Sequence, residues 1–204
     1  IYNGAFGECK MLESVTIPSS VKVIGNGAFY GCKNLKSVVL PDGVERVGTA
    51  VFSDCEKLAF NDYDNARYVG SAKNPYLLLA AAKSENITSC EINEKTEFIG
   101  GGAFYRLESL KSITIPKNVK SVGDYAFEGC GLTELIIENG VKEIGDEVFA
   151  DCAKLTRVTI PGSIEKTGDS AFWACGLTDV TLEKGVKSIG AGMFADCRNL
   201  ENLT

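Results

Sequence analysis

The sequence contains no histidine among its 204 residues. Imidazole bases, histidine metal ligands and histidine pH switches are therefore excluded. No apolar run reaches the length of about 18 residues that a transmembrane helix requires. Acidic residues outnumber basic ones, 27 against 21, and no basic stretch occurs. The sequence therefore predicts a chain that neither binds nucleic acid nor inserts into a membrane.

An internal repeat runs through the whole chain. Its unit reads L-x-S-V-x-I-P-x-x-V-x-x-I-G-x-x-A-F-x-x-C, and residues 12–34 show it in full. Each unit begins at an aliphatic residue and is followed after 22 or 23 residues by the next, except at one longer interval. The starting residues are Leu12, Leu35, Leu58, Ile87, Leu110, Leu132, Leu155, Leu177 and Leu200. Such a period is typical of a solenoid of stacked coils.

Three pieces make up each unit, as the first full one illustrates. Val15 and Ile17 alternate with polar residues, which predicts a short strand that ends at Pro18. The second piece ends at Gly25, which suits either a positive-φ corner or a close approach of two backbones. The third piece, residues 26–32, has its apolar residues on one side and predicts a short 3₁₀ or α turn. A phenylalanine stands in this piece in every regular unit, at Phe29, Phe52, Phe104, Phe127, Phe149, Phe172 and Phe194.

One coil cannot bury its apolar face alone, whereas stacked coils can. The predicted fold is therefore an α/β repeat solenoid, with a parallel sheet on one face and short 3₁₀ or α turns on another. We expect a single domain over residues 1–204, with regular coils at 1–57 and 87–204. Both ends of the sequence, Ile1 and Thr204, fall inside a coil, so we expect the chain to be part of a longer protein.

The unit resembles the BspA-type leucine-rich repeat, most clearly in Ser-Val-Thr-Ile-Pro followed by Ile-Gly-x-x-Ala-Phe-x-x-Cys. The resemblance covers essentially the whole chain. It implies a right-handed solenoid on a secreted or cell-surface bacterial protein, and adhesion or protein binding rather than catalysis. A protein partner or another host extracellular component is the expected ligand, a structural spacer that presents another domain is the alternative, and a monomer is favoured.

Residues 58–86 break the pattern and form an expanded coil. The runs 66–70 and 76–81 flank a segment that includes Asn74 and Pro75, which predicts a β-hairpin. Asp62 and Asp64 indicate either turn chemistry or a calcium site. Polar and aromatic residues gather here, so the hairpin is one candidate binding element, although a purely structural variant of the coil is the competing reading. Its candidate partner-binding residues are Tyr63, Asp64, Tyr68 and Tyr76.

The cysteines occupy a repeat position rather than a catalytic or metal-binding motif. Seven of the eight share one position in the unit, which Leu107 fills in another coil. A position that accepts leucine is a buried apolar one, so free buried thiols are expected. Without histidine, serine and cysteine lack their usual base, and no phosphate loop is present. The sequence therefore predicts a non-enzymatic protein without a cofactor.

A second candidate surface follows from the outward positions of the strands. One outward ladder presents Ser14, Ser37, Ser89, Ser112, Glu134, Arg157, Asp179 and Asn202, and its neighbour includes Glu91, Thr114 and Ile136. The early coils carry small hydroxyl residues, which mostly serve strand pairing. The later coils are less uniform. We therefore select Glu134, Ile136, Arg157 and Asp179 as candidate partner-binding residues, with a structural role as the alternative.

Overall fold

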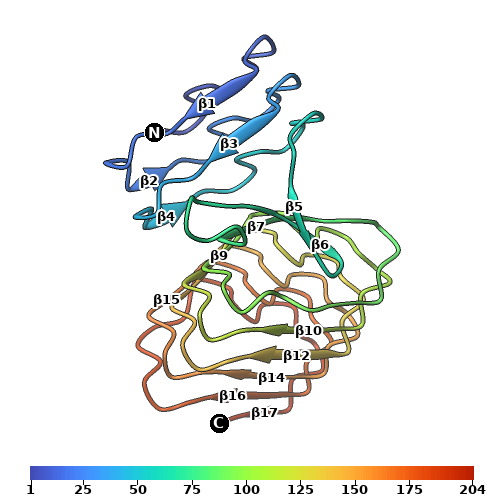
Figure 1. Cartoon of the computed structure of the whole chain (residues 1–204). Helices are drawn as coiled ribbons and strands as arrows, with labels where there is room; N and C mark the ends of the chain where they lie inside the picture. The colour runs from blue at the N-terminus through green and yellow to red at the C-terminus, as the bar shows by residue number, and fades with distance from the viewer.

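The computed structural model describes residues 1–204 as a stack of coils (Figure 1). Two short strands, one on each of two faces, recur in the regular coils, except that the coil beginning at Leu177 lacks the second strand. The strand face carries β1 (Ser14–Thr16), β3 (Ser37–Val39), β8 (Ser89–Cys90), β10 (Ser112–Ile115), β12 (Glu134–Ile137), β14 (Arg157–Ile160), β16 (Asp179–Leu182) and β17 (Asn202–Leu203). The corner face carries β2 (Val23–Ile24), β4 (Arg46–Val47), β9 (Phe98–Ile99), β11 (Ser121–Val122), β13 (Glu143–Ile144) and β15 (Lys166–Thr167).

The repeat register predicted from the sequence is confirmed. Strands of successive coils pair in parallel, with Ser112 between Ser89 and Glu134, and Arg157 beside Asp179. β-branched residues dominate the inward positions, which suits a pleated surface buried on one side. The strand face is divided into the sheets β1-β3, β8-β10-β12 and β14-β16-β17. The corner face forms the pair β2-β4 and a seven-stranded sheet that also includes the insertion.

No helix is present, so the expectation of 3₁₀ or α turns is wrong, and with it the α/β class. The third piece of each coil is a series of tight turns, here called the turn segment. Two residues four positions apart adopt positive φ in each turn segment, for example Gly27 at 58° and Gly31 at 68°. Such residues interrupt a right-handed helix. Alternate N–H groups of the segment also donate to carbonyls of the next coil instead of carbonyls within the segment. The N–H of Phe29, for example, donates to the carbonyl of Val51 at 3.0 Å. No helix capable of crossing a membrane is found.

The glycine that ends the second piece is required by close packing rather than by its own backbone angle. Gly25 does not adopt a positive φ. A Cβ atom on Gly25 would lie 2.6 Å from the backbone nitrogen of Asn3, and one on Gly123 would lie 2.5 Å from that of Gly101. Since real Cβ atoms do not approach backbone so closely, only glycine lets successive coils stack at this corner.

The expanded coil forms three antiparallel strands, one more than the predicted hairpin. These are β5 (Asn61–Tyr63), β6 (Ala66–Val69) and β7 (Leu78–Ala82), here called the insertion. The predicted pairing of the two apolar runs is confirmed, with Val69 opposite Leu78. β7 then pairs in parallel with β9, which joins the insertion to the next regular coil. The missed strand, β5, is polar and short, and the sequence gives it little alternation.

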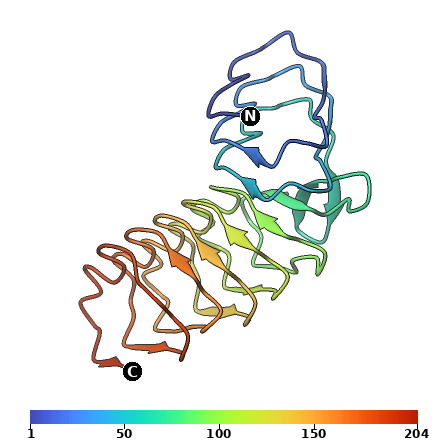
Figure 2. The same cartoon turned by 90° about the vertical axis from the view of Figure 1, so that its left-hand side faces the viewer.

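The insertion separates two blocks of regular coils, residues 1–57 and 87–204. Beside it, the coils before and after it meet directly through an isolated bridge between Thr49 and Gly101. Figure 2 shows that the stack bends here and that the insertion lies on the outer side of the bend. An added sheet on one side and direct contact on the other account for the change in direction.

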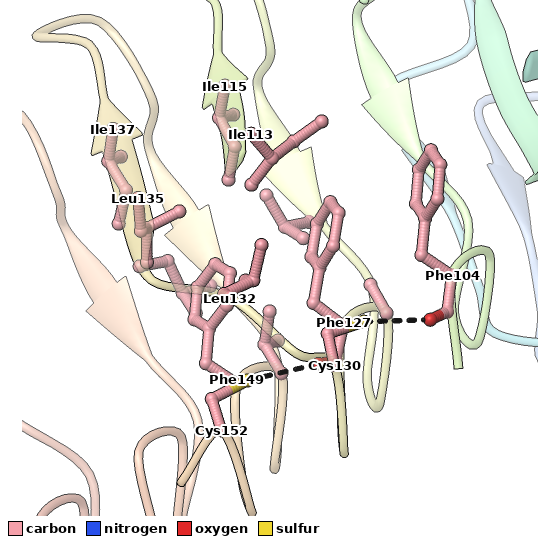
Figure 3. Packing of buried hydrophobic residues seen from close by; sticks show 14 of the residues in the cluster. Phe104, Ile113, Ile115, Phe127, Cys130, Leu132, Leu135, Ile137, Phe149 and Cys152 are labelled. Carbon is pink, nitrogen blue, oxygen red and sulfur yellow. Dashed lines mark hydrogen bonds between the residues drawn. The ribbon is translucent and has the colours of Figure 1, made fainter. Parts of the chain in front are cut away.

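The core is divided at the same place into clusters of 37 and 16 buried residues. Leu78 belongs to the smaller cluster and Leu79 to the larger, because neighbouring side chains of a strand point to opposite sides. Phenylalanines stack inside each block, as Figure 3 shows for Phe104, Phe127 and Phe149. The stack that ends at Phe52 does not continue to Phe104.

The cysteine thiols line the core beside the phenylalanine stacks. All eight are free; seven are buried as predicted, whereas Cys9 in the first, incomplete coil is exposed. The buried thiol of Cys130 donates to the carbonyl of Phe104 at 3.0 Å, and that of Cys152 to the carbonyl of Phe127 (Figure 3). Burial raises the pKa of Cys130 to about 12, so this thiol stays neutral and unreactive in the folded chain.

Candidate functional site

A groove on the strand face lies where the insertion meets the second block. It has a volume of about 550 Å³ and is here called the strand-face groove. The insertion contributes one wall through Asp64, and β8, β10 and β12 form the floor and the other wall. Its lining is acidic and polar: Asp64, Ser89, Cys90, Glu91, Ile92, Glu94, Ser112, Ile113, Thr114, Pro116, Glu134 and Glu138.

The turn between β5 and β6 fixes the insertion against the edge of this sheet. Asp64 adopts a positive φ of 46°, which suits a tight two-residue turn. Its carboxylate accepts a hydrogen bond from the N–H of Glu91 at 2.7 Å. The amide of Asn65 donates to the carbonyl of Ser89 at 2.9 Å. Two side chains thus replace the main-chain partners that a preceding strand would supply to β8.

The three tyrosines of the insertion have different environments. The hydroxyl of Tyr63 donates to the carboxylate of Glu91 at 2.6 Å, and this hydrogen bond raises the pKa of Tyr63. Tyr76 packs edge-on against both Tyr63 and Tyr68, with ring centroids 5.7 and 5.5 Å apart. Tyr68 is fully buried, and burial raises its pKa to about 12. Its ring presents no surface to a partner, so Tyr68 is not available as the partner-binding residue that the sequence predicted.

The candidates on the strand face separate into two places. Glu134 lines the strand-face groove, and the exposed side chain of Ile136 lies two residues along the same strand. Arg157 and Asp179 lie on the next two coils and form an ion pair, with 3.5 Å between Nε and Oδ2. The pKa of Asp179 is lowered by hydrogen bonds from Thr178 and Asn202 and by the charge of Arg157. The structure therefore brings Asp64 and Glu134 to one groove, whose Glu91 also holds Tyr63, while Arg157 and Asp179 neutralise each other outside the groove.

The electrostatic character of the groove follows from its lining. Its five carboxylates are those of Asp64, Glu91, Glu94, Glu134 and Glu138, and no lysine or arginine lines it. Three of the five hold the local structure, because Glu138 also accepts a hydrogen bond, from the N–H of Lys117 at 2.8 Å. Glu94 and Glu134 are exposed and free of ion pairs. A surface of this kind favours cationic groups.

Metal-binding geometry is not seen at the insertion or elsewhere. No group of three or more acidic or cysteine side chains converges as metal ligands do. Asp62 forms an ion pair with Lys83 at 3.2 Å, whereas Asp64 accepts from the N–H of Glu91. The two aspartates therefore stabilise turn and strand contacts instead of binding one metal ion together.

Among the groove carboxylates, Glu94 and Glu138 are the two that the sequence did not single out. Both lie just beyond the strands, where the repeat pattern assigns no direction to a side chain. The signal that could have found them was the position of Glu91 in the outward ladder next to the insertion. Acidic residues in the first and third coils after the expanded coil mark a place where a groove and a charge coincide.

Comparisons with known proteins place the repeat in a known group. A family model described as BspA type Leucine rich repeat region matches six copies, over residues 1–71 and 80–201. A leucine rich cell surface protein from Faecalibacterium prausnitzii A2-165 is 27% identical, with a TM-score of 0.69 over 100% of this chain and 62% of that one. A comparison with curated protein sequences finds no match.

Two further solved structures have the same fold. A leucine-rich repeat protein from Bacteroides ovatus ATCC 8483 is 28% identical, with a TM-score of 0.50 over 98% of this chain and 57% of that one. The pneumococcal vaccine antigen PcpA is 18% identical, with a TM-score of 0.62 over 94% of this chain and 56% of that one. This chain thus spans between 56% and 62% of the length of the three proteins.

Proposed function

Because this chain belongs to the BspA-type leucine-rich repeat family, we propose that it is a non-enzymatic module that binds a protein outside the cell, as part of a secreted or cell-surface protein. The similar protein from Faecalibacterium prausnitzii is a cell surface protein, which supports this location. Repeat solenoids bind through extended faces of their stacked coils. Adhesion to a host extracellular component is the specific role that we propose for it.

The observation that carries the proposal is the strand-face groove. Two candidate surfaces that are 70 residues apart in sequence, at Asp64 and Glu134, form opposite parts of one recess. Each of the two side chains that hold the insertion on β8 makes a hydrogen bond shorter than 3 Å, at 2.7 and 2.9 Å, so the groove has a defined shape before any partner binds. A preorganised recess loses less entropy on binding than a mobile loop does.

The chemistry of the groove selects the kind of partner. Exposed carboxylates at Glu94 and Glu134 favour a protein segment rich in lysine or arginine. The exposed side chain of Ile136, 47% accessible, lies two residues from Glu134 on β12 and adds apolar contact area. We therefore propose a basic segment of a host extracellular protein as the occupant of the strand-face groove.

The test is a binding screen of the 204-residue chain against immobilised extracellular matrix proteins and glycans, measured by biolayer interferometry. The double variant Glu94→Lys and Glu134→Lys should weaken a saturable interaction by about tenfold or more, equivalent to about 1.4 kcal/mol. Both side chains are exposed, so the variant should fold normally. The affinity of the original chain should also fall as salt is raised, because the contact is electrostatic.

A matched control is the double variant Glu108→Lys and Glu201→Lys, which makes the same charge change. Both side chains are exposed and free of ion pairs, and neither lines the groove. Equal loss of binding in control and groove variants would show that net charge alone acts, and would contradict the proposed site. The absence of any saturable partner for a demonstrably folded chain would favour the spacer role instead.

A further inference from the structure

The insertion is fixed to the second block by directional contacts on two faces. Its three strands belong to the same seven-stranded sheet as β9, β11, β13 and β15, and β7 pairs directly with β9. On the strand face, Asp64 and Asn65 hold the turn between β5 and β6 on β8. The insertion and the second block therefore form one hydrogen-bonded unit, and the junction with the first block lies on the other side of the insertion.

The first block meets this unit largely through apolar side chains. Val69 and Leu78 of the insertion and Phe98 of the second block belong to the smaller core cluster, together with the core of the first block. No strand of the first block pairs with a strand of the insertion. Apolar burial is not directional, so these contacts hold the two parts together without setting the angle between them. Hydrogen bonds are directional and do set an angle.

The loop between β6 and β7, residues 70–75, supplies such hydrogen bonds to the first block and is here called the clasp loop. The N–H of Leu40 donates to the carbonyl of its first residue at 2.9 Å. The carboxylate of Asp42 accepts from the hydroxyl of Ser71, which lowers the pKa of Asp42, and from the N–H of Lys73 at 3.1 Å. Asp42 is therefore ionised at neutral pH, and its charge strengthens both hydrogen bonds.

The clasp loop is braced internally and also reaches the second block. The N–H of Ser71 donates to the carbonyl of Asn74 at 2.8 Å, and the N–H of Asn74 donates to the hydroxyl of Ser71 at 3.1 Å. The side-chain oxygen of Asn74 accepts from the N–H of Tyr76 at 3.0 Å, which orients the amide. The nitrogen of the same amide donates to the carbonyl of Lys95 at 2.6 Å. One short loop is thus hydrogen-bonded to both blocks.

Two other directional contacts cross the junction. The N–H of Ala59 donates to the carbonyl of Lys36, where the chain leaves the first block. The isolated bridge joins Thr49 to Gly101. In the last coil of the first block, the chain connection lies before β3, the bridge lies after β4, and the clasp loop is bound after β3. Two points of contact define an axis, and a third point away from that axis fixes the angle about it.

We propose that the clasp loop is a strap that fixes the angle of the bend seen in Figure 2. While Asp42 and Asn74 hold the loop, the two blocks stay at one angle. Release of the loop leaves the first block free to turn about the axis through the other two contacts. Rotation of packed units about a few hinge residues is a general form of conformational change. The strand-face groove lies wholly within the insertion and the second block, so its shape does not depend on the clasp loop.

The distance between spin labels on the two blocks reports the angle. Cys9 in the first block is exposed and the other seven thiols are buried, so Cys9 is a natural labelling site. Lys154→Cys adds a second site at an exposed position of the second block. Pulsed electron paramagnetic resonance of the doubly labelled 204-residue chain gives the distribution of distances between the labels.

We expect the double variant Asp42→Ala and Asn74→Ala to broaden this distribution and to shift its mean, because the clasp loop then loses side-chain bonds to both blocks. The matched control is the double variant Glu183→Ala and Asn118→Ala. Glu183 accepts from a main-chain N–H at 3.2 Å, and Asn118 donates to a main-chain carbonyl at 2.8 Å, both within the second block. The control should keep the distribution of the original chain.

Three results would overturn the proposal. The first is an unchanged distribution in the clasp variant, and the second is equal broadening in the control. The third is loss of hydrogen-exchange protection throughout residues 1–57 of the clasp variant, which would mean that the first block unfolds instead of turning. Asp42→Ala alone changes an exposed side chain and should broaden the distribution to a smaller extent, so the test stays decisive if the double variant does not fold.

Discussion

Replacement of Phe127 by alanine should lower the free energy of unfolding by about 4–5 kcal/mol. The ring is fully buried and lies between Phe104 and Phe149, with centroids 5.0 and 5.4 Å away. Truncation of a buried phenylalanine costs about 3–5 kcal/mol. Each lost stacking contact adds about 0.5–1.5 kcal/mol beyond the buried area, which places this site at the upper end of the range. The cost is a large share of the about 5–15 kcal/mol that stabilises an ordinary domain.

The matched variant is Tyr105→Ala, which removes a ring from the surface of a neighbouring coil. Tyr105 is 45% exposed, and its main specific contact is with the guanidinium of Arg106, 5.2 Å from the ring centroid. A contact of that kind at an exposed site contributes about 0.5–1 kcal/mol. The expected loss is therefore about 1 kcal/mol or less.

Urea unfolding followed by the fluorescence of Trp173 measures both variants, because this single tryptophan lies in the same block. In thermal unfolding, each kcal/mol corresponds to roughly 2–4 °C for a chain of this size. Equal losses of unfolding free energy in the two variants would refute the reasoning. They would show that the phenylalanine position is not in the core, or that the position after it, which Tyr105 occupies, is not on the surface.

Three further predictions test the division of the chain and the chemistry of its core. Phe29→Ala should increase hydrogen exchange in residues 1–57 and leave 104–197 protected, because the two clusters share no residue; loss of protection throughout would contradict separate cores. Asn65→Ala removes the hydrogen bond to the carbonyl of Ser89 and should cost about 1 kcal/mol, with faster exchange at β8; unchanged exchange would show that the insertion is held by other contacts. Because burial raises the pKa of Cys130 from 9.0 to about 12, the folded chain holds this proton between those values while the unfolded chain loses it. The resulting stability is complete below pH 9 and is lost as the pH rises towards 12. Urea midpoints at pH 8 and pH 10.5 should show this decline, and Cys130→Leu, which copies Leu107, should make it smaller; an unchanged decline would assign it to other groups.

The sequence was sufficient for the repeat, the register of the strands and the buried ladders. Inward and outward positions of a strand alternate with a fixed period, so Ser112 and Glu134 could be aligned without a structure. The turn segment was misread because its apolar spacing also fits a helix. What decides its conformation is the exchange of hydrogen bonds with the neighbouring coil, as between Phe29 and Val51, which the sequence of one coil does not contain.

The candidate site was only partly predictable for a related reason. Asp64 and Glu134 were selected separately, on composition and on departure from the repeat, and their common groove depends on how the insertion folds back on β8. Tyr68 was selected with its neighbours because aromatic residues in an insertion favour binding, yet its ring fills the core. Whether a tyrosine points in or out follows from strand pairing within the insertion, which the missed strand β5 completes.

The bend at the insertion has a consequence for how such proteins diversify. Regular coils add length to the solenoid, whereas the insertion alone turns its axis (Figure 2). Duplication or deletion of a coil in either block would lengthen or shorten one arm and leave the angle between the arms unchanged. Movement of the expanded coil by one repeat would instead shift the bend along the chain. Reach and direction are thus encoded by different segments and can evolve separately.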